Sequence, residues 1–128
     1  MKFLFSIILV MLTSVYTEQE RDVTYLGPEA FYNSYNMEIY AIIADTRKAK
    51  EYRKSRIPDA VSVPKMKKLA VFADSLDVET PVYIYCDGEA RSRTVAEWLG
   101  NRGFTDLYIL KGGFNEWEAA GMTVDRKR

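Results

Sequence analysis

The chain has 128 residues, 48% of them hydrophobic and 13% aromatic, which suffices for one folded domain with a sizeable core. Eighteen basic residues balance eighteen acidic ones, and no run of five like charges occurs. We therefore expect neither nucleic acid nor an acidic membrane surface as a partner, and interpret Lys65, Lys67 and Lys68 as a solvated helix face. One cysteine and no histidine exclude a Cys-His dyad and a structural zinc site, and we expect no metal and no cofactor.

The N-terminus has the pattern of a secretory signal peptide. Lys2 precedes an apolar run over residues 3–15, and charged residues follow from Glu18. We place cleavage after Thr17, which gives a signal peptide over 1–17, an extension over 18–27 and a folded domain over 28–126. The predicted location is periplasmic or secreted. The alternative is an uncleaved membrane anchor over residues 3–16.

Alternating strand and helix patterns predict an α/β fold. Strands are predicted at 23–26, 39–44, 61–63, 82–85 and 107–110, and helices at 28–35, 48–55, 65–76, 92–102 and 114–120. Parallel strands need helix-length crossovers, so we expect a mainly parallel central sheet of about five strands with helices on both faces. Ligands bind at the carboxyl ends of such strands, where Cys86 lies.

The segment after the strand at 82–85 is the candidate reactive loop. Cys86 is nucleophilic as a thiolate, and both the amides of a helix N-terminus and the charge of Arg91 favour that anion. Cys86 and Arg91 are the predicted catalytic residues, although a buried structural cysteine is the simpler alternative. The other predicted loop residues are Asp87, Gly88, Glu89, Ala90 and Ser92.

Within this loop, each of four residues has a predicted role. Ser92 is predicted to cap the following helix. Gly88 is predicted to relieve strain where the amides curl inward. The carboxylates of Asp87 and Glu89 are expected to point to the rim, where they affect which substrate or partner approaches.

Four motifs in order carry a family resemblance: Asp45-Thr46-Arg47, the segment 51–61, the loop 86–92 and the glycine- and tryptophan-containing segment 112–124. With them the chain resembles single-domain rhodaneses, which are sulfurtransferases, from residue 28 to 124. The resemblance implies a rhodanese-like three-layer domain and a persulfide on Cys86. It also implies a small sulfur donor (thiosulfate, a polysulfide or a persulfide) and a thiol or cyanide acceptor, or a protein acceptor.

Loop length and sequence refine this implication. Six residues from Cys86 to Arg91 match rhodaneses, whereas the related phosphatases and arsenate reductases have one more. Arg56 and Asp59 replace the family's usual histidine and glycine, and Gly88 comes one place early. The acids in the loop leave the identity of the donor open. Two other functions also stay open: a non-catalytic protein-binding module and a cysteine phosphatase or arsenate reductase.

Overall fold

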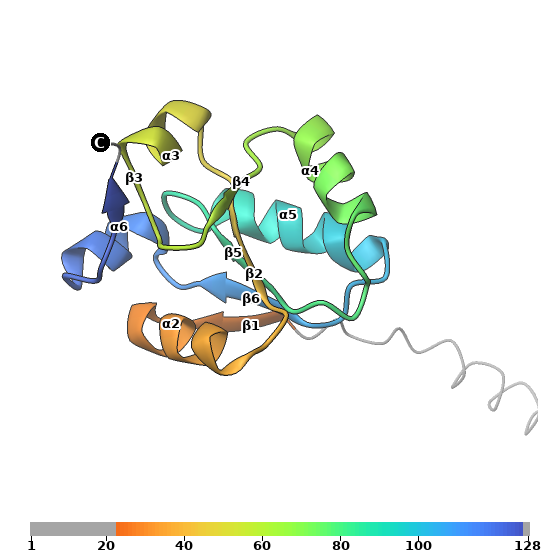
Figure 1. Cartoon of the computed structure of the whole chain (residues 1–128), viewed down its shortest axis with the longest axis horizontal. Helices are drawn as coiled ribbons and strands as arrows, with labels where there is room; N and C mark the ends of the chain where they lie inside the picture. Colours follow the sequence, from red (N-terminus) through yellow and green to blue (C-terminus); the bar gives the residue numbers. More distant parts are fainter. Residues whose placement is uncertain (1–22, 127–128) are drawn as a thin grey trace, which may run out of the picture.

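The central sheet has five parallel strands in the order β1-β6-β5-β2-β4 (Figure 1). The structure is a computed structural model that describes residues 23–126, so the predicted signal peptide and residues 18–22 lie outside the described residues. The predicted mainly parallel sheet of about five strands is confirmed. Its strands are β1 (Val23–Leu26), β2 (Ile42–Asp45), β4 (Val61–Ser62), β5 (Val82–Tyr85) and β6 (Leu107–Leu110).

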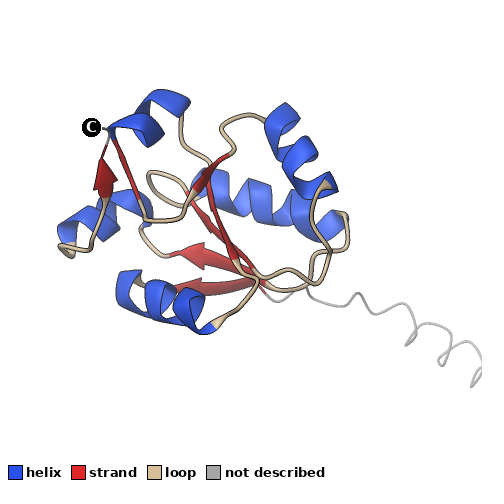
Figure 2. Ribbon diagram, in the orientation of Figure 1, coloured by secondary structure: helices blue, strands red, loops and turns tan. Residues whose placement is uncertain are grey.

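Helices cover both faces of the sheet (Figure 2), which confirms the three-layer arrangement. They are α2 (Pro28–Met37), α3 (Ala49–Lys54), α4 (Met66–Asp74), α5 (Ala90–Asn101) and α6 (Gly113–Ala119). Alternation along β5 sends Val82 and Ile84 into the core shared with α4 and α5, and Tyr83 and Tyr85 into the core shared with α2 and α6. A small antiparallel sheet of β3 (Ser55–Arg56) and β7 (Asp125–Arg126) was not predicted.

The predicted strand at 39–44 is wrong at its start. Ile39 and Tyr40 are 85% and 81% exposed, and β2 begins only at Ile42. Ile42 pairs with Val82, where the neighbouring strand β5 itself begins, so residues 39–41 have no strand to pair with. The apolar run therefore predicts a strand that starts too early. Within residues 23–126, no helix is both long enough and apolar enough to cross a membrane.

Candidate active site

Cys86 lies at the carboxyl end of β5, the middle strand of the sheet, where the sequence predicted the site. Its residue is 5% exposed, and its thiol is free. A hollow of about 320 Å³ opens beside it. The residues that line this hollow, called here the cysteine hollow, are Arg47, Lys48, Cys86, Asp87, Gly88, Ala90 and Arg91.

The backbone of the loop is oriented by helix α6. The amide of Phe114 donates to the carbonyl of Cys86 at 2.8 Å, and that of Asn115 to the carbonyl of Asp87 at 3.2 Å. By contrast, the N–H groups of residues 87–92 have no acceptor among the described residues. Six successive donors therefore remain available directly after the cysteine, an arrangement that suits an anion.

Gly113 makes this docking of the loop possible. It has φ of 64°, and a Cβ at this position would lie 2.2 Å from the carbonyl oxygen of Gly88 and 2.5 Å from that of Asp87. The prediction that Gly88 itself relieves strain is wrong. Gly88 does not have a positive φ, and a Cβ there would meet no atom within 4 Å. The close approach of the two segments requires glycine on the α6 side instead.

The two loop carboxylates differ in orientation. Asp87 is exposed and lines the cysteine hollow. Glu89 is half-buried, and its Oε2 accepts the N–H of Gly112 at 2.7 Å, while its Oε1 lies 3.4 Å from Nη1 of Arg93. The prediction that both acids point to the rim therefore fails for Glu89, which ties the loop to the turn before α6.

Ser92 is not the helix cap that the sequence predicted. Helix α5 begins at Ala90, its N-cap is Glu89, and its first backbone bond runs from the Arg93 amide to the Glu89 carbonyl at 3.0 Å. Ser92 is thus the third helical residue and is fully buried. Its hydroxyl has no hydrogen-bond partner among residues 23–126.

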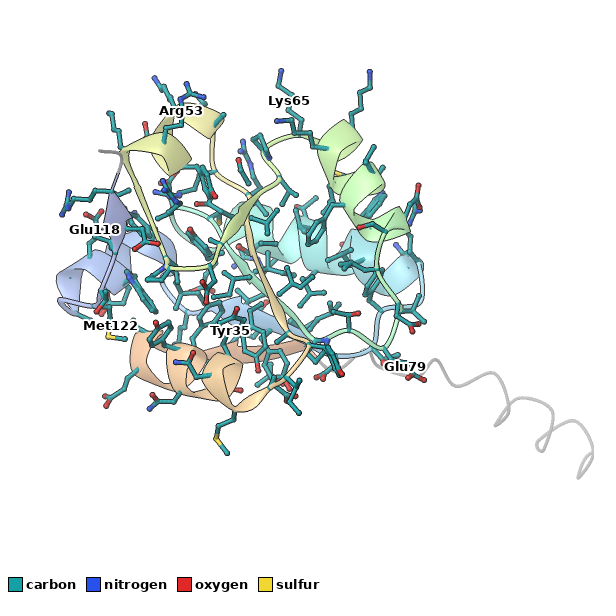
Figure 3. The ribbon with its side chains drawn as sticks, in the orientation of Figure 1. Tyr35, Arg53, Lys65, Glu79, Glu118 and Met122 are labelled. Atoms are coloured by element: carbon teal, nitrogen blue, oxygen red, sulfur yellow. The ribbon has the colours of Figure 1, made fainter. Side chains whose placement is uncertain are left out.

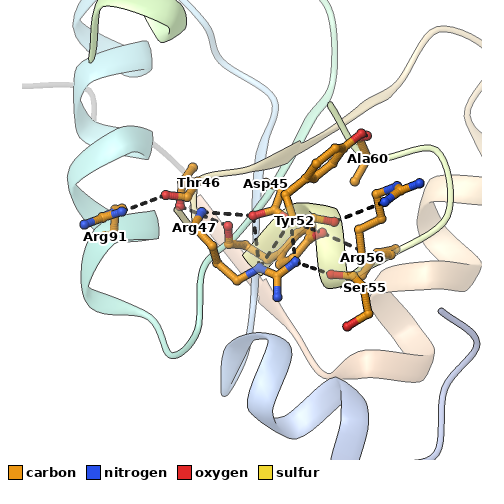
Figure 4. A network of polar contacts seen from close by, with 10 residues as sticks. Asp45, Thr46, Arg47, Tyr52, Ser55, Arg56, Ala60 and Arg91 are labelled. Carbon is orange, nitrogen blue, oxygen red and sulfur yellow. Dashed lines mark hydrogen bonds and ion pairs between the residues drawn. The ribbon is translucent and has the colours of Figure 1, made fainter. Parts of the chain in front are cut away.

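Arg91 lies on the first turn of α5 and connects it to β2. Its Nη1 donates to the backbone carbonyl of Thr46 at 2.9 Å (Figure 4). Arg91 and Ala90 also line a second hollow of about 440 Å³, to which Lys65 and residues of α4 and α5 contribute. The remaining lining residues are Thr46, Val63, Pro64, Met66, Leu69, Thr94 and Val95.

A buried polar network surrounds Arg47 (Figure 4), which also lines the cysteine hollow. Arg47, 3% exposed, donates through Nε and Nη2 to both carboxylate oxygens of Asp45, and through Nη2 to the carbonyl of Ser55 at 2.7 Å. The hydroxyl of Tyr85 donates to Asp45 at 2.5 Å, and the Arg47 guanidinium lies 3.9 Å from the Phe114 ring centre. Burial lowers the pKa of Arg47, but the hydrogen bonds and charge of Asp45 outweigh it and raise that pKa overall.

Arg47 lines the cysteine hollow but was not among the site residues predicted from the sequence. A usable signal existed, because Asp45-Thr46-Arg47 directly follows a predicted strand, as Cys86 does, and the carboxyl ends of parallel strands lie at one edge of the sheet. In the structure Asp45 pairs with Tyr85 in parallel register, so the residues after these two strands meet at one edge. The negative charge of Asp87 further raises the pKa of Arg47, because the two charged groups lie near each other at the hollow.

Comparison with known proteins agrees with this geometry. The family model of the rhodanese-like domain matches residues 28–120. The chain belongs to this family. It is 36% identical over 87 residues to the thiosulfate sulfurtransferase GlpE of Coxiella burnetii, covering 68% of this chain and 80% of that protein. It is 30% identical over 114 residues to YqhL of Bacillus subtilis, covering 89% of this chain and 87% of that protein.

Solved structures show the same fold. A structure of the Alr3790 protein from Anabaena sp. superposes with a TM-score of 0.71 at 22% identity, covering 79% of this chain and 81% of that one. A rhodanese-like domain protein from Staphylococcus aureus superposes with a TM-score of 0.62 at 25% identity, covering 73% of this chain and 90% of that one.

Proposed function

We propose that this rhodanese-like domain is a sulfurtransferase that carries sulfane sulfur as a persulfide on Cys86. The observation that supports this most strongly is the run of N–H groups over residues 87–92, directly after the cysteine, that have no acceptor within residues 23–126. A thiolate and a persulfide are both anions, and such donors stabilise either one. Moderate identity to thiosulfate sulfurtransferases supports the same reaction class.

The proposed reaction has two displacements that balance without an added oxidant. The Cys86 thiolate attacks the outer sulfur of the donor, a sulfur–sulfur bond forms to Cys86, and the donor's own bond to that sulfur breaks. With thiosulfate, sulfite leaves with the electron pair. An acceptor thiolate or cyanide then attacks the outer sulfur of the persulfide, and the Cys86 thiolate leaves.

Charges at the hollow fit an anionic donor. Arg47, Lys48 and Arg91 line it with one carboxylate, that of Asp87. We propose that Arg91 attracts the donor and, through its bond to the Thr46 carbonyl, fixes the first turn of α5. The buried hydroxyl of Ser92, which has no partner in the described part of the chain, is the proposed donor to the persulfide sulfur.

The test is intact mass after incubation with thiosulfate, inorganic polysulfide, a low-molecular-weight persulfide or mercaptopyruvate. We expect a one-sulfur increment that is absent in Cys86→Ala and is removed by cyanide. The Arg91→Ala variant should show slower alkylation of Cys86 at neutral pH. If no donor produces the increment, the enzymatic proposal is overturned in favour of a protein-binding module.

The same preparations distinguish the remaining reaction class. The six-residue loop from Cys86 to Arg91, and the lack of a candidate general acid other than Asp87 or Glu89, disfavour phosphate-monoester or arsenate chemistry. Cys86-dependent hydrolysis of p-nitrophenyl phosphate, or reduction of arsenate with a thiol present, would replace the proposal by that class.

Export is a separate proposal, based on the charged, apolar and polar order of residues 1–22. Expression in a Gram-negative host should yield a periplasmic protein that starts after Thr17, as read by N-terminal sequencing. Recovery of the full-length chain in the cytosol contradicts export, and recovery in the membrane fraction supports an anchor over residues 3–16.

A further inference from the structure

Half of the basic residues of this neutral chain lie in one short stretch. Residues 47–68 contain nine lysines and arginines and two acids, although the whole chain has eighteen of each charge. Six of these cations are exposed and have no ion-pair partner among the described residues. They define what we call the basic face: Lys48, Lys50, Arg53, Lys65, Lys67 and Lys68.

The fold gathers the two halves of this stretch at one edge of the molecule. Helix α3 and the start of α4 lie at the same edge (Figure 1), and the labelled side chains of Arg53 and Lys65 both point outward there (Figure 3). Lys48 lines the cysteine hollow, and Lys65 lines the neighbouring hollow across Arg91. The basic face therefore borders the entrance to Cys86.

The stability of α4 does not account for the three lysines at its start. Lys65 is the N-cap of α4 but its side chain makes no capping bond, and Lys67 and Lys68 occupy the first turn, which contains no acidic residue. Cations at this end oppose the helix dipole and cost about 0.3–1 kcal/mol each. Lysine also lacks the acceptor oxygen that a cap supplies. The placement destabilises the helix locally, which points to a role outside folding.

We propose that the basic face docks an acidic protein surface and thereby brings that partner's thiol or persulfide to Cys86. This rests on the proposed function. A ligand confined to either hollow cannot contact Lys50, Arg53, Lys67 and Lys68, which line neither, so the occupant must extend over two helices. Complementary charge would speed encounter and set orientation.

A protein fits this face better than a nucleic acid. Asp87 lines the cysteine hollow, and its negative charge repels a uniform chain of phosphates, whereas a protein surface can mix its charges. Base stacking needs exposed aromatic rings. Tyr52 on α3 is half-buried with the Arg56 guanidinium 4.8 Å from its ring centre, and the exposed Tyr40 precedes β2, at the opposite end of the sheet from Cys86.

The first arm of the test measures sulfur transfer. Cys86 persulfide is mixed with synthetic peptides that carry one cysteine flanked by glutamates or by glutamines, and loss of the extra sulfur is followed by intact mass. Each rate is divided by that peptide's rate with 2-hydroxyethyl disulfide, which corrects for thiol reactivity. At low salt we expect the acidic peptide to react about 10-fold faster than the neutral one, with the advantage lost near 0.5 M salt.

Matched variants locate the effect. Lys67→Gln with Lys68→Gln lowers the net charge by two on the basic face and should reduce the acidic peptide's advantage at least 3-fold. Asn33→Glu with Asn36→Glu lowers it equally on the exposed side of α2, which lies away from α3 and α4 (Figure 1), and should leave the advantage intact. Equal normalised rates for the two peptides, or equal losses in both variants, overturn the proposal.

A second arm does not depend on catalysis. Fluorescein-labelled glutamate-rich peptide without cysteine is titrated with Cys86→Ala protein and with the two charge variants in that background. Salt-sensitive binding that weakens only with the Lys67 and Lys68 changes supports the docking face even if no donor forms a persulfide. Absent binding, or tighter binding of an RNA oligonucleotide of equal charge, overturns it.

Discussion

Gly113 lies directly against the carbonyl oxygen of Gly88, so close that a single methyl group would come within 2.2 Å of that oxygen. This contact joins two segments that are 25 residues apart in the sequence, the reactive loop and the turn before α6. The amides of Phe114 and Asn115 then hold the loop carbonyls on that side. The glycine is therefore part of the mechanism that orients the loop amides, although it does not line the cysteine hollow.

Replacing Gly113 by alanine should displace the loop. We expect alkylation of Cys86 by iodoacetamide to slow about 10-fold or more, since loss of the amide donors costs about 1–3 kcal/mol for the anion. Gly121→Ala is the matched control, because Gly121 also has a positive φ, of 70°, but a Cβ there meets nothing within 4 Å. Both variants should lose stability through φ strain. Equal alkylation rates in the two would show that the contact does not hold the loop.

The bond from the Gly112 amide to Glu89 should make a smaller contribution to the same loop. Glu89→Ala leaves that amide without its acceptor, and we expect a loss of about 1–2 kcal/mol in the free energy of unfolding with faster hydrogen exchange at Gly112. Glu89→Gln retains an acceptor oxygen and should restore most of both. Glu97→Ala, on the exposed side of α5, serves as the control. Unchanged exchange at Gly112 in Glu89→Ala would contradict the assigned bond.

Sequence patterns predicted the elements well where hydrophobic periodicity is decisive. The strands at 23–26, 82–85 and 107–110 are found with their predicted bounds. Errors arise where a neighbouring strand, and not the local sequence, decides whether a strand forms. Ile39 and Tyr40 look like strand residues but have no neighbouring strand, and β3 and β7 are too short to show any period.

The position of the candidate site in the fold could be predicted from the sequence, but the contacts within it could not. Cys86 and its loop were predicted from a strand, a cysteine and a following helix. The roles of Glu89, Ser92 and Gly113 depend on where α5 begins and on how closely α6 approaches, and no local pattern encodes either. Asp59 is instructive in the same way. It replaces the family's glycine, and its φ of 71° is a left-handed backbone conformation that glycine usually adopts.

The Asp45–Arg47 pair should be the most costly polar interaction to break. Both side chains are almost fully buried, so Asp45→Asn leaves a buried guanidinium without its counter-charge. We expect a loss of about 3–5 kcal/mol in urea unfolding. Asp74→Asn, which breaks an exposed pair with Arg102, should cost less than about 1 kcal/mol. Comparable losses in the two variants would mean that burial does not govern the strength of the Asp45–Arg47 pair.

Tyr85 should make stability fall at alkaline pH. Burial, and then the charge of Asp45, raise the pKa of Tyr85 above its ordinary value, so folding keeps the phenol protonated. Above about pH 10 the unfolded chain releases this proton and the folded chain does not, and the free energy of unfolding drops by up to about 1.4 kcal/mol per pH unit. Tyr85→Phe should be less stable at pH 8, with the gap to wild type narrowing between pH 10 and 11. A constant gap across urea titrations would contradict this.

Substitution of Ser92 should change persulfide formation but hardly change stability. The Ser92 hydroxyl is buried and has no partner among the residues that the structure describes, so it contributes little to folding, and Ser92→Ala should change the free energy of unfolding by less than about 1 kcal/mol. If its hydroxyl donates to the persulfide, the same variant should form the persulfide about 10-fold more slowly in stopped reactions read by intact mass. Ser34→Ala should show the reverse, because that hydroxyl is hydrogen-bonded to Tyr83 at 2.7 Å and lies on α2, which contributes no residue to the cysteine hollow. A Ser92→Ala protein that is destabilised by several kcal/mol yet transfers sulfur normally would reduce Ser92 to a packing residue.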